Sequence, residues 1–229
     1  MLALPLEGRH GAPVRVLCLG AHSDDIEIGC GGTVLELVER LPCVEFTWVV
    51  LSGNDTRADE ARLSADLFLQ GASRAHVLVK DYRDGFFPYV GDQIKEFFEE
   101  LKQRPAPDVI FTHHRADRHQ DHRLVSDLTW NTFRDHFILE YEIPKYDGDL
   151  GRPNCYVPLD DARCSTKIRH LLHAFASQRD RRWFSEETFR GLLRLRGVEC
   201  AAADGYAEAF HAHKWTLWPR PGGGAGRVE

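Results

Sequence analysis

Short, uninterrupted apolar runs alternate with helical patterns along the first two thirds of this chain, and no other feature limits its fold as strongly. The apolar runs are predicted to be strands, over residues 14–19, 46–51, 76–79, 108–112 and 137–142. Between them, apolar residues recur at helical spacing over residues 32–41, 59–69, 94–101 and 122–133. Continuously apolar strands are typical of a parallel sheet with helices on both faces. The sequence therefore predicts an α/β fold with a mostly parallel central sheet.

The last third of the chain gives weaker signals. Residues 155–159 are predicted to form a strand, residues 161–176 and 185–194 helices, and residues 206–211 an edge strand. A length of 229 residues, of which 43% are hydrophobic, suits one domain with a sizeable core. We expect a single α/β domain over residues 14–218, preceded by a flexible N-terminal segment over residues 1–13 and followed by a disordered tail over residues 219–229.

Charge and hydropathy argue against two classes of partner. The chain has 29 Lys and Arg residues against 35 Asp and Glu residues, which gives a net charge of −6. Nucleic-acid binding requires clustered positive charge, so no nucleic-acid partner is expected. No apolar run approaches the ~20 residues that cross a bilayer, and the first 13 residues lack the long apolar region of a secretory signal. We therefore expect a cytoplasmic protein without a membrane span.

A first cluster of ionisable residues follows the first predicted strand, where residues 20–32 read GAHSDDIEIGCGG. A glycine-rich stretch before a helix can bind phosphate, but its three acids would repel one, and the dinucleotide fingerprint GxGxxG is absent. Imidazole and carboxylate suit a metal better. His22 and one of the adjacent Asp24 and Asp25 would be ligands, with the other aspartate free as a general base. The alternative is a solvated acidic loop.

A second cluster follows the predicted strand over residues 108–112. Residues 113–122 read HHRADRHQDH, with four histidines and two aspartates. A protein core would not tolerate this composition unpaired. His119 and His122 lie three residues apart and can point to one side, and Asp117 and Asp121 are available to orient metal-binding imidazoles. The order Asp-His, rather than the His-Asp of metal phosphohydrolases, weakens a phosphohydrolase interpretation.

Together the two clusters resemble the PIG-L/LmbE-like family of metal-dependent de-N-acetylases. The first family motif, AHPDD, stands here as residues 21–25, AHSDD, and the second, HxDH, as residues 119–122, HQDH. The similarity extends through residues 138–143 to residues 206–210, which covers nearly all of the chain except its two ends. Ser23 replaces the usual proline, which puts the rigidity of the loop in doubt but removes no ligand. The resemblance implies a Rossmann-like three-layer fold.

The resemblance also implies a set of roles for these residues. One Zn²⁺ per chain would be held by His22, Asp25 and His122, leaving a position open for water. Another divalent ion such as Fe²⁺ suits the same nitrogen and oxygen ligands. Asp24 would be the general base, and His119 would stabilise the oxyanion or act as the acid. The substrate would be an N-acetylglucosamine-like sugar or sugar conjugate that loses its N-acetyl group.

Other residues have less specific expected roles. Asp121 would orient His119 or keep it cationic. Five residues are weaker candidates for contacts with the substrate: Arg57, Arg62, Asp84, His113 and Asp117. The alternative is that the first three are ordinary exposed charges and the last two support the ligands.

Two other functions remain open from the sequence. One is a non-catalytic α/β module that binds a sugar or a nucleotide. The other is a metallophosphoesterase, which would need two metals ~3.5–4 Å apart. The number of bound metal ions distinguishes the three hypotheses. One ion per chain supports the deacetylase, two support the metallophosphoesterase, and none supports the binding module. A homo-oligomer is compatible with each of them.

Overall fold

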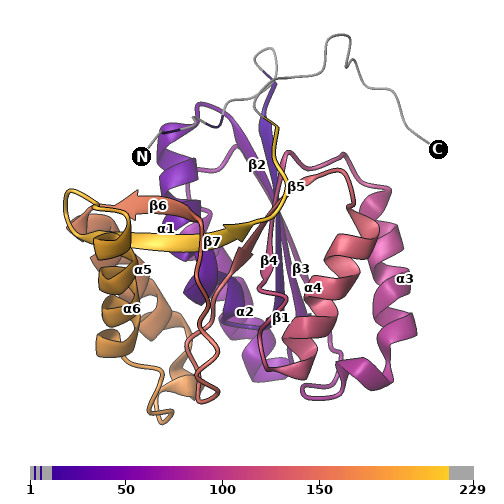
Figure 1. Ribbon diagram of the computed structural model, residues 1–229. Helices are drawn as coiled ribbons and strands as arrows, with labels where there is room; N and C mark the ends of the chain where they lie inside the picture. Colours follow the sequence, from indigo (N-terminus) through magenta and orange to yellow (C-terminus); the bar gives the residue numbers. More distant parts are fainter. Residues whose placement is uncertain (1–2, 4–5, 7–11, 217–229) are drawn as a thin grey trace.

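A seven-stranded, mostly parallel sheet forms the centre of the molecule (Figure 1). The structure is a computed structural model and describes residues 3, 6 and 12–216. The strands lie in the order β3-β2-β1-β4-β5-β7-β6, the first five parallel and the last two joined by antiparallel pairs. Their bounds are β1 Val14–His22, β2 Val44–Ser52, β3 Arg74–Val79, β4 Val109–His113, β5 Phe137–Tyr141, β6 Cys155–Leu159 and β7 Tyr206–Ala212.

Helices cover both faces of this sheet, which confirms the predicted three-layer α/β fold. Helices α1, α2, α5 and α6 pack on one face, whereas α3 and α4 pack on the other (Figure 1). Adjacent β1 residues such as Leu17 and Cys18 point into opposite cores. The bounds are α1 Asp25–Arg40, α2 Asp55–Phe68, α3 Gly91–Lys102, α4 Gln120–Thr132, α5 Asp161–Ala174 and α6 Glu186–Glu199, with short 3-10 turns η2 Phe87–Tyr89 and η3 Ala176–Gln178.

The prediction that residues 206–211 form an edge strand is wrong. Strand β7 pairs with β5 on one side and with β6 on the other, so β6 lies at the edge. The charged Glu208 and the polar His211 within the run suggest exposure, yet both are buried. Glu208 tolerates burial because the ammonium group of Lys167 contacts its carboxylate at 2.6 Å.

The glycine-rich stretch after the first aspartates is helical, not a loop. Helix α1 begins at Asp25, whereas the sequence predicts its start at Gly32. A Cβ atom on Gly29 would lie 2.2 Å from the ring of Tyr141, and one on Gly32 would lie 2.5 Å from Leu159. These glycines therefore let the helix approach the sheet closely.

Some of the predicted features stay untested. The predicted tail over residues 219–229, and most of the predicted segment over residues 1–13, lie outside the described residues. Among the described helices, none is both long and apolar enough to cross a membrane. The single domain and the cytoplasmic location remain predictions.

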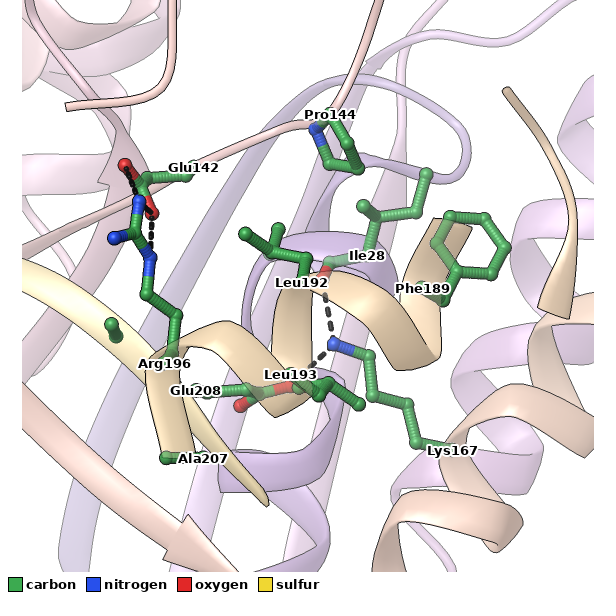
Figure 2. Close-up of a pocket in the computed structure, with 12 residues that line it drawn as sticks. Ile28, Glu142, Pro144, Lys167, Phe189, Leu192, Leu193, Arg196, Ala207 and Glu208 are labelled. Atoms are coloured by element: carbon green, nitrogen blue, oxygen red, sulfur yellow. Dashed lines mark hydrogen bonds and ion pairs between the residues drawn. The ribbon is translucent and has the colours of Figure 1, made fainter. Parts of the chain in front are cut away.

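The C-terminal third of the chain holds α1 through a buried ion pair (Figure 2). Lys167 of α5 donates to the carbonyl oxygen of Ile28 and to Oε1 of Glu208, both at 2.6 Å. The same carboxylate accepts the backbone N–H groups of Gly32, at 2.7 Å, and Thr33, at 2.6 Å. In a regular helix the Gly32 amide donates to the Ile28 carbonyl. Here Glu208 accepts the Gly32 amide and Lys167 donates to the Ile28 carbonyl, so the ion pair is hydrogen-bonded to the backbone of α1.

Substitution of Lys167 by Met is expected to lower the free energy of unfolding by about 3–5 kcal/mol, because it leaves the buried Glu208 carboxylate without a counter-charge. Urea denaturation measures this change. The matched control is Lys95→Met, which removes the partner of Glu99 in a pair that is 36% and 47% exposed and should cost less than ~1 kcal/mol. Equal losses of unfolding free energy in the two variants would show that the buried pair stabilises the fold no more than the exposed pair does.

Candidate metal centre

The two ionisable clusters meet because β1 and β4 are adjacent and parallel. Residues 16–18 of β1 pair with residues 109–111 of β4, so the carboxyl ends of both strands lie at the same edge of the sheet. His22 ends β1, and Asp25 begins α1 immediately after it. His119 is the N-cap of α4, and His122 lies in the first turn of that helix. Ligand sites in open α/β sheets lie at such an edge.

Three of the predicted ligands form a compact triangle. His22 Nδ1 lies 3.1 Å from His122 Nε2 and 3.3 Å from Asp25 Oδ2. His122 Nε2 lies 3.5 Å from Asp25 Oδ1. The two distances to Asp25 end at different oxygens of its carboxylate, so the three side chains are close enough to hold one cation, with either oxygen of Asp25 available as the ligand. Asp25 and His122 are each 3% exposed, which keeps bulk water from competing.

Two carboxylates orient the imidazole rings from behind. Asp117 Oδ2 lies 3.0 Å from His122 Nδ1, and its Oδ1 accepts the backbone N–H of His119 at 2.7 Å. Asp121 Oδ2 lies 3.3 Å from His22 Nε2. The Asp121 carboxylate thus contacts His22, which differs from the predicted contact with the ring of His119. Asp121 lies in the first turn of α4, and its carboxylate also accepts the backbone N–H groups of Gly85 and Phe87.

His119 lies beside the triangle as a hydrogen-bond donor. Its Nδ1 accepts the backbone N–H of Asp121 at 3.3 Å, so the ring proton of the neutral form is on Nε2. Burial and the nearby His22 lower the pKa of His119. The imidazole is therefore neutral near pH 7, whereas the sequence suggested a cation held by Asp121.

Asp24 has one bonded and one free carboxylate oxygen. Helix α2 begins at Asp55, earlier than predicted, because the Asn54 side chain caps it, and this places Arg57 in its first turn. The Arg57 guanidinium donates to Asp24 Oδ1 at 2.9 Å. Asp24 Oδ2 is buried and has no hydrogen-bond partner among the described residues. Burial raises the pKa of Asp24, and the Arg57 charge opposes that rise.

The remaining candidates occupy different positions. Asp84 reaches the rim of the site, with its Oδ1 3.1 Å from His22 Nε2 and its side chain 73% exposed. His113 is buried beneath the triangle, and its Nε2 accepts the backbone N–H of Ala21 at 3.0 Å. Its Nδ1 has no hydrogen-bond partner among the described residues, and His113 forms with Asp25 and His122 another group of ligand atoms close enough to hold a metal ion. Arg62 lies apart and contacts Asp59 on the exposed side of α2.

One contributor to the site has no sequence signal. Lys145, in the segment between β5 and β6, donates to Asp117 Oδ2 at 2.8 Å. A single lysine in a polar segment has no spacing or motif that predicts this contact. Only the pairing of β5 with β4 brings the segment to the site.

Charges within the cluster set its protonation in the metal-free protein. Burial lowers the pKa of His22, but the neighbouring carboxylates of Asp25 and Asp121 outweigh this effect and raise the pKa well above its ordinary value. Burial raises the pKa of Asp25, but three nearby imidazoles bring it well below its ordinary value. Burial and the adjacent His113 lower the pKa of His122 to about 3. At pH 7 His22 is therefore charged and His122 is neutral.

Comparison with known proteins then decides the family. The sequence model of the PIG-L family, described as GlcNAc-PI de-N-acetylase, matches residues 17–133. This match includes both ionisable clusters. The chain belongs to the PIG-L family.

Relatives of this PIG-L family member include an uncharacterized deacetylase, YaiS, of Escherichia coli strain K12, which is 33% identical over 141 residues, or 56% of this chain and 74% of the relative. Among solved structures, the N,N'-diacetylchitobiose deacetylase of Pyrococcus horikoshii matches with a TM-score of 0.64 and 21% identity, over 87% of this chain and 83% of its own. The hydratase GalB of Pseudomonas putida matches with a TM-score of 0.67 and 17% identity, over 93% and 100%. A shared fold thus leaves the reaction to be argued from the site.

Binding of one divalent cation to the metal-free protein at pH 7 is expected to release about one proton, because His22 is charged and the other two ligands are already deprotonated. Accordingly, the logarithm of the affinity should rise with pH with a slope of about one until the pH passes the pKa of His22. Calorimetry in buffers of different ionisation enthalpy measures the protons released. A release of two protons, or of none, would contradict this charge assignment.

Proposed function

We propose that this PIG-L family protein hydrolyses the N-acetyl amide of an N-acetylglucosamine-like sugar or sugar conjugate. The observation that carries the proposal is the free Oδ2 atom of the buried Asp24, the residue that directly precedes the proposed ligand Asp25 in the chain. Binding alone needs no unpartnered carboxylate oxygen beside a cation site, whereas hydrolysis needs a base there. The family description and the chitobiose deacetylase support an acetylated amino sugar as the substrate class.

His22, Asp25 and His122 would hold one divalent cation. These three side chains lie close together, and their nitrogen and oxygen donors suit Zn²⁺, Fe²⁺ or another divalent ion. When bound, the cation polarises an amide carbonyl and makes water a stronger acid. The orienting carboxylates of Asp117 and Asp121 fix the two rings, which is the usual support for metal-binding histidines.

Asp24 would carry the proton through the reaction. Its Oδ2 accepts a proton from the attacking water while Arg57 holds the other oxygen in place. The water oxygen forms a bond to the amide carbon, the C–N bond breaks, and the proton passes from Asp24 to the departing amine. The products are acetate and a free amino sugar. Arg57 would thus orient the general base, and a contact between Arg57 and the sugar is the less favoured interpretation.

His119 would stabilise the charge that develops on the amide oxygen. Its Nε2–H is a neutral donor beside the ligand triangle, with the His119 ring centroid 4.8 Å from that of His22 and 4.5 Å from that of His122. Removing one such donor commonly costs ~2.7–4 kcal/mol of transition-state stabilisation. The exposed Asp84 at the rim is the best placed of the remaining candidates to bind a sugar hydroxyl.

A metallophosphoesterase is the less favoured function. A second group of close ligand atoms, from His22, Asp84, His119 and Asp121, shares His22 with the triangle. In this group both oxygens of Asp121 and Nδ1 of His119 already accept backbone N–H groups, which leaves Nε2 of His119 as the free ligand atom of these two residues. A count of one metal per chain supports the deacetylase.

Substitution of Asp24 by Asn is expected to lower kcat about 10²–10⁴-fold, the usual contribution of a general base. The cation should stay bound because the three ligands are unchanged. The assay is the release of free amine and acetate from N-acetylglucosamine and N,N'-diacetylchitobiose, with and without a chelator, using metal-analysed protein.

The matched control is Asp59→Asn, since Asp59 lies on α2 with an 84% exposed side chain and should leave turnover unchanged. His122→Ala should lose the cation together with turnover. Normal turnover by the Asp24→Asn variant would sink the proposed mechanism.

A further inference from the structure

The segment between β5 and β6 sends one ammonium group back to the metal centre. Lys145 Nζ donates to Asp117 Oδ2 at 2.8 Å and to Asp149 Oδ2 at 2.6 Å, and its side chain is only 11% exposed. Asp149 Oδ2 also accepts the backbone N–H of Arg118 at 2.6 Å. The lysine therefore bridges two carboxylates, one in the segment that carries the histidines and one in its own segment.

Asp117 in turn holds both histidines of the second motif. Its Oδ1 accepts the backbone N–H of His119, and its Oδ2 faces Nδ1 of His122. Lys145 and His122 share that Oδ2 atom. The carboxylate is 3% exposed, so water does little to hold it in place. Its position therefore depends on these donors.

The ammonium group also prevents a repulsion. Oδ2 of Asp117 and Oδ2 of Asp149 both lie within 2.8 Å of the same nitrogen atom. The two side chains are 3% and 7% exposed, so solvent screens their charges weakly. Without the positive charge between them, the carboxylates would repel each other, and Asp117 would move relative to His122.

We propose that Lys145 is a positioning residue of the metal centre, which holds Asp117 and Asp149 together and thereby fixes the ring of His122. This inference builds on the proposed function, because it assigns His122 as a ligand. It places one determinant of cation affinity outside both sequence motifs. Removing an outer partner of a metal-binding histidine typically costs 10–100-fold in metal affinity.

The test measures Co²⁺ affinity of the full-length, metal-free protein by visible absorption against a competing chelator. Lys145→Met should weaken binding about tenfold, because the two carboxylates then repel each other. The double variant Lys145→Met/Asp149→Asn should recover most of the lost affinity, since it removes the repelling charge. Lys145→Arg should also retain most of it. The control Lys102→Met, on the exposed side of α3, should bind Co²⁺ like the wild type.

A Lys145→Met variant that binds Co²⁺ within twofold of wild type overturns the proposal. So does a double variant that binds as weakly as Lys145→Met, which would show that repulsion is not the cause. If Lys145→Met does not fold, the other two variants are compared with the wild type: both should retain most of the Co²⁺ affinity, and a tenfold loss in either overturns the proposal. A wild type that binds no Co²⁺ overturns the metal site and this inference together. Tight, Lys145-dependent binding without amide hydrolysis would sustain the inference and reject the proposed function.

Discussion

The whole site depends on the parallel pairing of β1 with β4. These two strands are far apart in the sequence, and their hydrogen-bonded register brings His22 and His122 to one edge of the sheet, 3.1 Å apart at their nearest ring nitrogens. Side chains from a single segment could not surround a cation in this way. The buried apolar residues of the central strands, packed between helices on both faces, keep that register fixed.

Around this edge several buried charges have a partner of opposite charge or a hydrogen-bond partner. Each of the two ligand imidazoles faces a carboxylate, Asp121 for His22 and Asp117 for His122, and Arg57 faces Asp24. Burial of so many ionisable groups would be costly without these pairs. Among the described residues, Oδ2 of Asp24 has no hydrogen-bond partner, and the same is true of both carboxylate oxygens of the buried Glu27 and of Nδ1 of His113. A buried polar atom without a partner requires an explanation, and for Asp24 we propose catalysis.

Much of the architecture follows from the sequence because apolar runs and helical spacing are local signals. The strands that carry the motifs, and the helices between them, form where these signals predict them, although α1 and α2 begin earlier. Two features needed tertiary information. The stretch before Gly32 looks like a loop, yet it is helical, and glycine at positions 29 and 32 allows α1 to pack where Tyr141 and Leu159 leave no room for a Cβ atom. Strand β7 looks like an edge because of Glu208, whose partner Lys167 comes from another element.

The candidate site, too, could be predicted from the sequence only in part. The motifs identify the residues that meet, since residue type and spacing carry that information. They do not reveal which carboxylate faces which imidazole, because this depends on how the first turn of α4 points. The contact of Asp121 with His22 and the approach of Lys145 to Asp117 are set by the packing of separate segments.

Crystallography with anomalous diffraction at the metal absorption edge would locate the cation. We expect a single cation per chain, bound by Nδ1 of His22, a carboxylate oxygen of Asp25 and Nε2 of His122, with Oδ2 of Asp24 facing the open coordination position. A cation bound elsewhere, or a His122 ring outside coordination distance of the other two ligands, would contradict this expectation.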